Sequence, residues 1–390
     1  MNLSLDLAEK KYVSMKVIGV GGAGGNAINR MASSQMGGIE LVAINTDAQA
    51  LSFSQASHKV QIGNNITKGL GTGGDPELGK KAAEEDKDQI AEVLRDTNMV
   101  FLTAGMGGGT GTGASPLIAE LAKDAGALTV GVVTKPFLFE GSKRMVCAEE
   151  GIYQLRERVD TLIVIPNQRL LSIADEKQTL LEAFKMADSV LYQATRGISD
   201  LITVPGLINL DFNDVKAVML EMGDALMGTG TARGENRAVE AAQQAIRSPL
   251  LEDISIGGAK GVLVNISGGT NMTLHDVDTA ATIIYEEAGK DANIILGAVI
   301  DEKLDEEIRV TVIATGLNRP TAGMQKESGF KISSQGKTWS VEVPTFIRNR
   351  RQTRRKPGPV EDILTEPIDK LWSHSDLLEE KKEQQISNHP

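Results

Sequence analysis

The sequence predicts an α/β protein built on a doubly wound, mostly parallel sheet. Short β-branched runs alternate with helical stretches as far as about residue 316, which is the rhythm of βαβ units. Two of these runs end directly in glycine clusters. The chain has 390 residues, of which 41% are hydrophobic and only 4% aromatic, so it is long enough for two domains with aliphatic cores.

The first part of the chain supplies five expected strands and the helices between them. The strand runs are short and rich in Val, Ile and Leu, as in strands buried on both faces of a sheet. Strands are expected at 15–20, 41–45, 98–103, 128–134 and 161–165, and helices at 26–32, 76–94, 116–123 and 142–158.

A long helical stripe occupies 179–203. Its apolar residues from Leu180 to Leu201 recur at spacings of three and four, which predicts a central helix of about six turns. We expect this helix to join a first α/β domain at 15–178 to a second, smaller one at 204–316. In the second domain, helices are expected at 235–246 and 274–287, and strands at 261–266, 293–300 and 308–314.

The regular pattern stops near residue 316. Residues 1–14 and 317–341 are expected to be flexible, the latter as a polar linker. Residues 342–348 (EVPTFIR) form a short apolar and basic island, typical of peptides that dock into partner grooves. The tail at 349–390 continues the basic run RNRRQTRRK, which is compatible with anionic lipid or with simple solvation.

Composition excludes several classes of protein. The first residues lack the apolar stretch of a secretory signal, and no run is long enough to span a membrane. Cys147 is the only cysteine, so a reducing cytoplasm is expected and no disulfide framework exists. The four histidines are scattered and predict no metal cluster. The chain has a net charge of −11. The acidic excess lies in residues 1–316, whereas residues 317–390 have a small basic excess, and so acidic a body argues against nucleic-acid binding.

Two glycine clusters directly follow predicted strands. The first is GVGGAGGNA at 19–27, and the second is AGMGGGTGTGASP at 104–116. Glycine lets backbone N–H groups surround an anion without a Cβ clash, and a following helix N-terminus adds about half a positive charge. A third glycine-rich stretch lies at 69–74. Together these stretches predict a ligand that carries a chain of phosphates, although tight turns are the simpler alternative for each.

The kind of nucleotide is open at this point. Gly19, Gly21 and Gly24 form a G-x-G-x-x-G pattern, with an acidic residue about 20 positions further on, which is compatible with NAD. The second, richer cluster has no obvious use in a dehydrogenase. The chain has no G-x-x-x-x-G-K-[ST] motif, which excludes a P-loop NTPase.

The spacing GGGTGTG at 107–113 matches the glycine signature of the tubulin/FtsZ family. The chain resembles the bacterial cell-division members of this family from about Met15 to Thr315. Further matching blocks occur in order: GVGGAGGNA at 19–27, NTDAQAL at 45–51, TKPFLFEGSKR at 134–144, IPNQRLL at 165–171 and NLDFNDV at 209–215. The resemblance implies a GTPase that polymerises.

The resemblance also implies a set of residues that bind GTP or GDP, together with Mg²⁺. Thr110 would offer its hydroxyl, Glu140 and Arg144 would contact ribose and phosphate, and the carboxylate of Asp188 would accept guanine N–H groups. From the residues alone, Arg144 is equally a surface charge and Asp188 an exposed helix acid. The implied positions are Gly22, Ala23, Gly24, Gly25, Asn26, Asn45, Gly73, Gly105, Gly107, Gly108, Gly109, Thr110, Gly111, Glu140, Arg144, Asn167, Phe184 and Asp188. No metal site made of protein side chains is expected.

The block NLDFNDV carries two acids at the start of a predicted helix near Asn213. N-caps would explain such acids. By resemblance, however, this loop reaches over the nucleotide of the next subunit. Asp211 and Asp214 would there polarise the attacking water, and Asn209 would help to position it. An active site shared in this way requires head-to-tail stacking, which gives a filament when the contact does not close.

The resemblance further implies a place and partners for this filament. It would form the ring at the mid-cell division site, in the cytoplasm under the inner membrane, and recruit other division proteins. Residues 342–348, through Pro344, Phe346, Ile347 and Arg348, would bind membrane tethers and regulators. In the family this peptide lies close to the chain end, whereas residues 349–390 follow it here. An NAD-dependent enzyme and a nucleotide-regulated scaffold without hydrolysis remain the alternatives.

Overall fold

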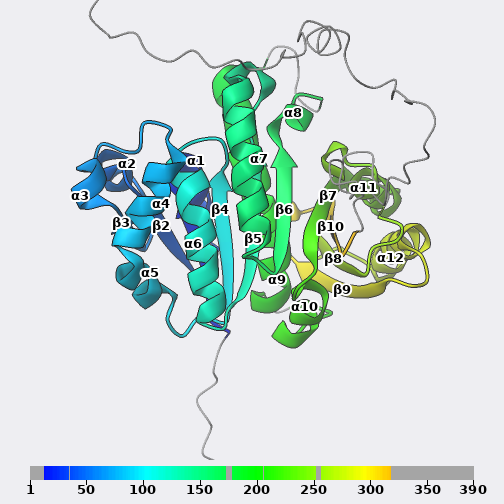
Figure 1. Cartoon of the computed structure of the whole chain (residues 1–390). Coiled ribbons are helices and arrows are strands. Elements are labelled where there is room, and N and C mark those ends of the chain that lie inside the picture. The colour runs from blue at the N-terminus through cyan, green and yellow to red at the C-terminus, as the bar shows by residue number, and fades with distance from the viewer. Residues whose placement is uncertain (1–12, 35, 173–177, 205, 252–255, 318–390) are drawn as a thin grey trace, which may run out of the picture. The chain divides into compact units, whose positions relative to one another are not determined.

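The strands form one continuous sheet in the order β3-β2-β1-β4-β5-β6-β7-β10-β8-β9 (Figure 1). The computed structural model describes residues 13–34, 36–172, 178–204, 206–251 and 256–317. The expected linker, peptide and tail from 318 onward therefore lie outside the described residues, as do residues 1–12. The strands are β1 (Met15–Val20), β2 (Ile39–Asn45), β3 (His58–Gln61), β4 (Met99–Gly105), β5 (Leu128–Lys135), β6 (Thr161–Pro166), β7 (Gly223–Arg233), β8 (Gly261–Gly268), β9 (Asn293–Ile300) and β10 (Glu307–Thr315).

Helices cover both faces of this sheet. They are α1 (Gly21–Ser33), α2 (Ala48–Ser52), α3 (Asn64–Thr67), α4 (Pro76–Glu85), α5 (Lys87–Leu94), α6 (Thr110–Asp124), α7 (Ser142–Arg156), α8 (Asn167–Leu170), α9 (Leu180–Thr203), α10 (Phe212–Met219), α11 (Arg237–Ile246) and α12 (Leu274–Ala288). Short 3₁₀ turns η1 (Leu138–Glu140), η2 (Pro249–Leu251) and η3 (Glu302–Leu304) complete the described elements.

The sheet is parallel from β3 to β7 and mixed beyond it. The pairs β1–β2, β1–β4, β2–β3, β4–β5 and β5–β6 are all parallel. The pair β6–β7 is also parallel, but it joins only Thr161–Ile163 to Gly223–Ala225. The strand β10 runs antiparallel between β7 and β8, and β8 pairs in parallel with β9. The predicted doubly wound, mostly parallel α/β fold is thereby confirmed.

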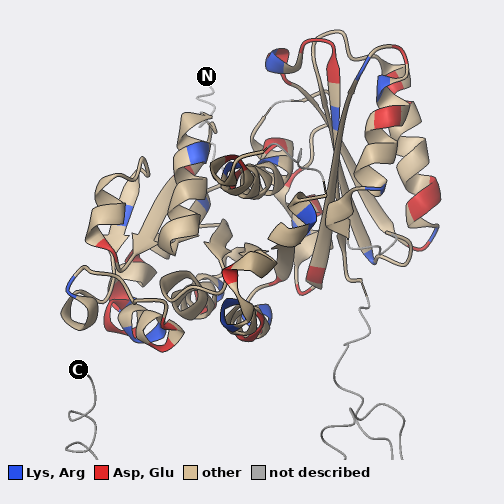
Figure 2. Ribbon diagram, turned by 90° about the horizontal axis from the view of Figure 1, so that it is seen from above, with Lys and Arg blue, Asp and Glu red and all other residues tan. Residues whose placement is uncertain are grey.

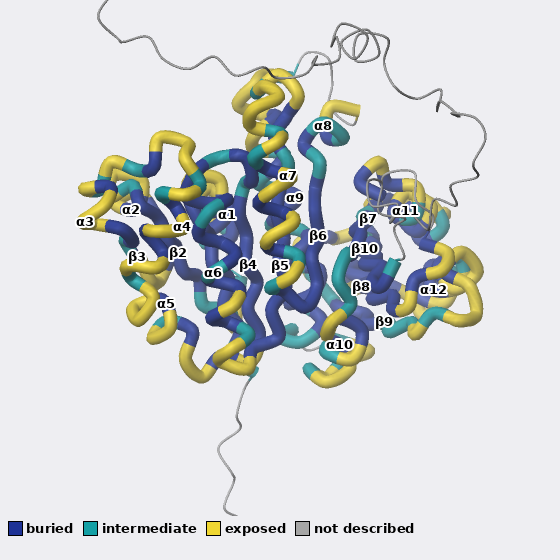
Figure 3. Tube along the Cα trace, viewed as in Figure 1, coloured by how far each residue is buried: buried dark blue, intermediate teal, exposed yellow. Residues whose placement is uncertain are grey.

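Alternate residues of the buried strands feed two cores on opposite faces of the sheet. In β1, Met15 and Val17 belong to the core beneath α1 and α9, whereas Ile18 and Val20 belong to the core beneath α4–α7. This period of two is that of a strand whose side chains point alternately to both faces. A third core fills the space between β7–β10 and the helices α11 and α12. Figure 3 shows the strands as the most deeply buried layer.

Some boundaries differ from the sequence-based expectations. The helices α1 and α6 begin at Gly21 and Thr110, inside the glycine clusters, and not at the later residues 26 and 116. The expected helix at 76–94 is two helices separated at Asp86. The edge strand β3 was not expected, because its residues His58 and Lys59 are polar and exposed.

The strand β7 was also missed, because its sequence GDALMGTGTAR is rich in glycine. A Cβ on Gly228 would overlap the carbonyl oxygen of Ala245, and one on Gly230 that of Ala241. Both oxygens belong to α11. The glycines therefore let a helix approach the strand backbone directly, a packing reason that local strand propensity does not reveal.

The central helix α9 is 24 residues long, which corresponds to about 36 Å. Thr179 and Glu182 form a capping box that begins it. Near its other end, the Arg196 guanidinium binds Asp200 at 2.8 Å and Asp301, just after β9, at 2.7 Å. The helix thus spans the sheet and is tied to the β8–β9 side of the molecule.

The substitution Gly113→Ala tests whether close packing between two helices, α6 and α4, requires glycine at this position. A Cβ at Gly113 would overlap the Pro76 carbonyl oxygen at the start of α4, so we expect a loss of about 1–3 kcal/mol in unfolding free energy. The measurement is urea unfolding followed by circular dichroism. Gly37→Ala is the control, since nothing lies within 4 Å of its Cβ. Equal stability of the two variants would contradict the packing account.

Candidate functional site

A cavity of about 310 Å³ opens at the carboxyl ends of β1, β4 and β5, the edge at which parallel sheets bind ligands. The N-termini of α1 and α6 adjoin it, so both helix dipoles favour an anion there. Its lining residues are Val20, Gly22, Ala23, Thr72, Gly105, Met106, Gly108, Gly109, Thr110, Gly111, Thr134, Pro136, Glu140, Arg144, Asn167, Phe184, Ala187, Asp188 and Leu191.

Some glycines of the two clusters face open space. A Cβ on Gly22 or Gly25 would meet no heavy atom within 4 Å, and one on Gly108 would meet only Arg144 Nη2, at 4.0 Å. No neighbouring atom therefore explains their lack of a side chain. Backbone N–H groups at such positions can approach a phosphate chain closely.

Other glycines serve packing between backbones. A Cβ on Gly24 would lie 2.6 Å from the Thr103 carbonyl oxygen, so this residue lets α1 rest on β4. A Cβ on Gly111 would lie 2.9 Å from the oxygen of Gly105. At Gly109, a Cβ would overlap the Thr72 side chain. The clusters are rich in glycine because open and close-packed positions alternate within them.

A charged pair forms one rim of the cavity. Glu140 accepts a hydrogen bond from the backbone N–H of Phe137 at 2.8 Å with one oxygen, and binds Arg144 Nη1 at 2.6 Å with the other. Arg144 Nε also approaches the Gly107 carbonyl oxygen, at 3.5 Å. Because both Glu140 oxygens are engaged, Glu140 holds the Arg144 guanidinium in one orientation beside the glycine-rich backbone of the cavity.

Aromatic rings adjoin this charged pair, in a chain with only eight Phe residues. Phe184 meets Phe137 edge-on with ring centroids 5.6 Å apart, and Phe137 stacks on Phe139 at 5.0 Å. Phe184 is 39% exposed and lines the cavity. A flat heterocycle can stack on such a ring.

Two polar side chains in the cavity lack adequate partners. The Asn167 side chain is buried, and its Oδ1 accepts no hydrogen bond, so it suits a hydroxyl donor such as that of a ribose. Burial raises the pKa of Asp188 to about 6, although the charge of Arg30 opposes the rise. A half-buried carboxylate with so little compensation suits N–H donors of a base.

A second cavity of about 250 Å³ lies against α1 and α2. Gly25, Asn26 and Asn45 line it, and Gly22 lines both cavities. The two asparagines therefore surround the α1 N-terminus but do not line the first cavity.

The structure gathers most of the predicted nucleotide residues around the first cavity. These are Gly22, Ala23, Gly105, Gly108, Gly109, Thr110, Gly111, Glu140, Arg144, Asn167, Phe184 and Asp188. Three predicted positions, Gly24, Gly73 and Gly107, line neither cavity. The binding roles of all these residues stay predictions.

Sequence reasoning missed several lining residues. Thr134 and Pro136 lie at the end of β5, where the position of the strand end is a usable signal. Ala187 and Leu191 follow Phe184 at helical spacings of three and seven, which is another. Thr72 lies inside the glycine-rich stretch 69–74 and Met106 inside the cluster 104–116, so their place among these glycines is a usable signal for both.

The predicted catalytic block lies at the far end of α9. Asp211 and Asp214 form a capping box for α10: Asp211 Oδ1 accepts from Asp214 N at 2.9 Å, and Asp214 Oδ2 from Asp211 N at 3.3 Å. Asn209 Oδ1 accepts from the Gly206 backbone N–H. Capping therefore uses one oxygen of each carboxylate. The exposed Asp211 and Asp214 keep one oxygen each for another role.

These acids are distant from the cavity of their own chain. From Asp188, at the cavity, to Thr203, α9 rises about 22 Å at about 1.5 Å per residue, and the acidic block follows Thr203. The strand β7, which comes after α10, starts beside Thr161, at the amino end of β6. The cavity, by contrast, lies at the carboxyl ends of β1, β4 and β5.

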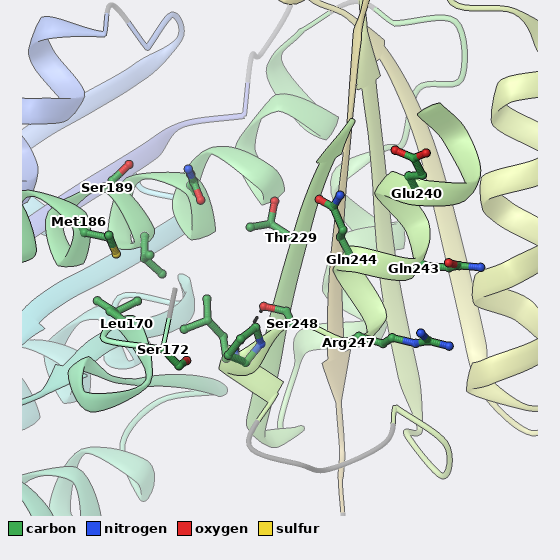
Figure 4. A pocket seen from close by; sticks show the side chains of 14 residues that line it. Leu170, Ser172, Met186, Ser189, Thr229, Glu240, Gln243, Gln244, Arg247 and Ser248 are labelled. Carbon is green, nitrogen blue, oxygen red and sulfur yellow. Dashed lines mark hydrogen bonds between the residues drawn. The ribbon is translucent and has the colours of Figure 1, made fainter. Parts of the chain in front are cut away.

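A larger cleft, of about 800 Å³, separates α9 from β7 and α11. Figure 4 shows apolar Leu170 and Met186 opposite Gln243, Gln244 and Arg247. It has no glycine-rich strand end and no helix N-terminus bare of side chains, so it lacks a phosphate cradle. The smaller cavity remains the candidate nucleotide site.

The distribution of charged, metal-ligating and apolar residues bears on what else the described residues can bind. Most acidic and basic residues lie on the helices and loops, and the strands are largely free of charge (Figure 2). Among the described residues, no group of three or more His, Cys, Asp and Glu side chains could hold a metal ion. No helix in the described part of the chain has the length and apolar character to cross a membrane.

Comparisons with known proteins agree with this geometry. The model of the tubulin/FtsZ family GTPase domain matches residues 14–175, and that of the FtsZ family C-terminal domain matches residues 223–318. An empty FtsZ dimer from M. jannaschii is 45% identical, with a TM-score of 0.77 over 80% of this chain and 90% of that one. A mutant FtsZ from M. jannaschii is 46% identical, with a TM-score of 0.76 over 78% and 92%.

A more distant likeness concerns the fold alone. A CetZ2 protofilament with bound GTPγS, from Haloferax volcanii, is 21% identical. Its TM-score is 0.65 over 77% of this chain and 92% of that chain.

Asp188→Asn tests the cost of the half-buried carboxylate in the nucleotide-free protein. The folded-state pKa of about 6 lies above the ordinary 3.8, so ionised Asp188 opposes folding as pH rises from about 4 to 6. We expect the variant to gain unfolding free energy over the wild type across this range, and to keep the gain above pH 6. Denaturant unfolding at pH 4 and pH 7.5 measures it. A difference independent of pH would contradict the raised pKa.

Proposed function

Because the chain belongs to the tubulin/FtsZ family, as an FtsZ-type GTPase that binds GTP and GDP, we propose that it polymerises head-to-tail and completes each active site with a neighbouring subunit. One observation carries the proposal: the acidic block and the nucleotide cavity lie at opposite ends of α9 in the same chain. Because the candidate catalytic carboxylates lie away from the nucleotide cavity of their own chain, a second copy of the chain has to bring its carboxylates to that cavity.

The cavity residues fall into roles along the nucleotide. We assign the phosphates to the backbone at Gly22 and Gly108 and to the Thr110 hydroxyl, with Arg144 beside them. We assign the ribose to Asn167, whose Oδ1 lacks a hydrogen-bond partner. We assign the base to Phe184, on which it would stack, and to Asp188, which would accept its N–H groups. The boundaries 15–178, 179–203 and 204–316 are kept as the proposed domains.

A magnesium ion fits this donor set only in company with the phosphates. No cluster of protein carboxylates occurs among the described residues, and Mg²⁺ is commonly held by phosphate oxygens, water and few protein ligands. Thr110, at the α6 N-terminus and in the cavity lining, would offer its hydroxyl to such an ion. The ion would supply charge neutralisation during phosphoryl transfer.

Hydrolysis then needs a positioned water and little else. The capping box holds Asp211 and Asp214 in fixed orientations, so their free oxygens are preorganised before another subunit arrives. Against a γ-phosphate they would orient and polarise the attacking water, with Asn209 beside it. The same acids, left as caps alone, would give a scaffold that binds GTP without hydrolysing it.

Head-to-tail contacts repeat without closing and produce a filament. We propose that this filament forms the division ring in the cytoplasm, at mid-cell, and recruits other division proteins. Residues 342–348 would bind membrane tethers and regulators through Pro344, Phe346, Ile347 and Arg348. Assembly favoured by GTP and loosened by its hydrolysis is the cycle that this site supports.

Turnover per molecule should depend on protein concentration. A shared site predicts near-zero specific activity in dilute solution and a rise beyond a threshold, because only stacked subunits have complete sites. Phosphate release measured over a dilution series, with light scattering in parallel, tests this. Constant specific activity at every dilution would rule out the shared site.

Variants at Asp214 separate catalysis from capping. Asp214→Glu keeps a capping-box residue at this helix position but displaces the carboxylate, and Asp214→Ala removes it. We expect both to bind GTP and polymerise, and Asp214→Ala to lose turnover on the order of 10²-fold or more. Thr273→Ala, which removes the N-cap of α12, is the control for cap loss alone. Wild-type turnover in both Asp214 variants would reduce this residue to a cap.

A further inference from the structure

Three threonine hydroxyls meet beside the phosphate end of the cavity. Thr46 directly follows β2, Thr72 precedes α4, and Thr110 begins α6. Oγ1 of Thr46 lies 2.7 Å from Oγ1 of Thr110, whereas Oγ1 of Thr72 lies 3.5 Å from it. Thr110 and Thr72 line the cavity, but Thr46 is 0% exposed and is not a lining residue. Thr46 can therefore influence a ligand only through its neighbours.

The number of hydroxyl protons decides how these groups can act. Each threonine hydroxyl has one proton to donate, and a phosphate oxygen can only accept. When Thr110 donates to a phosphate, its bond with Thr46 survives only if Thr46 is the donor. At 2.7 Å the Thr46–Thr110 bond has normal geometry, and at 3.5 Å the Thr72 contact is marginal. Thr46 is thus the main partner of Thr110 within the protein.

We propose that Thr46 is a positioning residue for the phosphates of the nucleotide, acting through Thr110. Its hydroxyl donates to Thr110, fixes the Thr110 rotamer, and leaves the Thr110 proton directed into the cavity. Hydrogen bonds in such a chain polarise one another, so each strengthens the next. The inference rests on the assignment of Thr110 to the phosphates in the proposed function.

The surroundings of Thr46 suit this role. Its carbonyl oxygen accepts a hydrogen bond from the Thr67 hydroxyl at 3.3 Å. The next residue, Asp47, caps α2 through Ala50 N at 3.0 Å and bridges to Leu70. The backbone at Thr46 is therefore fixed by β2, by α2 and by the loop at 68–71. A side chain on so rigid a support can hold a second hydroxyl in one orientation.

The test is nucleotide affinity of the full chain stripped of nucleotide, measured by calorimetry with guanosine, GDP and GTP. Thr46→Val and Thr46→Ala should weaken GDP and GTP binding by about 3- to 10-fold, the effect of one hydrogen bond. Guanosine affinity should not change, because it carries no phosphate. Thr46→Ser should restore wild-type affinities. Guanosine binding also shows that each variant is folded.

A double-mutant cycle isolates the route through Thr110. Thr110→Val alone should weaken GDP and GTP binding, and Thr46→Val should add nothing further in that background. The matched control is Thr103→Val. Thr103 is buried in β4, and its hydroxyl has no partner, so all three affinities should stay within about twofold.

Each remaining result overturns the inference. Unchanged GDP and GTP affinity in Thr46→Val and Thr46→Ala would show that Thr46 has no such role. An equal loss for guanosine, or in the Thr110→Val background, would show a general structural effect. If Thr110→Val itself left affinity unchanged, the assignment of Thr110 in the proposed function would also fail. If Thr110→Val weakened GDP and GTP binding while the Thr46 variants did not, the role of Thr46 would fail and the assignment of Thr110 would stand.

Discussion

Everything at the candidate site depends on how closely backbones approach one another at the ends of β1 and β4. The helix α1 rests on β4 through Gly24, and α6 meets the end of β4 through Gly111, each without room for a Cβ. This contact brings two helix N-termini to one edge of the sheet, where their dipoles and N–H groups can act on the same anion. Arg144, Asn167 and Asp188 then only complete a cradle that the main chain has already made.

The fold follows from the sequence where side chains alone decide it. The runs at β1, β4, β5 and β6 are aliphatic and buried on both faces, so their pattern predicts parallel strands. In β7, at Gly24 in α1 and at Gly111 in α6, glycine is present because another backbone is close. Local propensity opposes a regular element at these places, and only the tertiary contact explains it.

Prediction of the site from sequence is limited in the same way, because contacts between distant parts of the chain leave no local pattern. The glycine clusters and the family resemblance indicated most lining residues, because consecutive positions share one strand end or one helix face. Thr72 and Met106 stand inside two of these glycine stretches but were missed, because the prediction singled out the glycines and the residues that the resemblance implied. The pairing of Thr46 with Thr110, 64 residues apart, is invisible in one sequence. Conversely, Asn26 and Asn45 proved to line the neighbouring cavity.

The short ladder between β6 and β7 has a mechanical consequence. Only three residue pairs join these strands, whereas the neighbouring ladders are longer. Across this seam, load passes mainly through side chains: the apolar face of α9 and the pair that Arg196 of α9 forms with Asp301, just after β9. Under tension or bending, this seam therefore yields before the continuous ladders on either side.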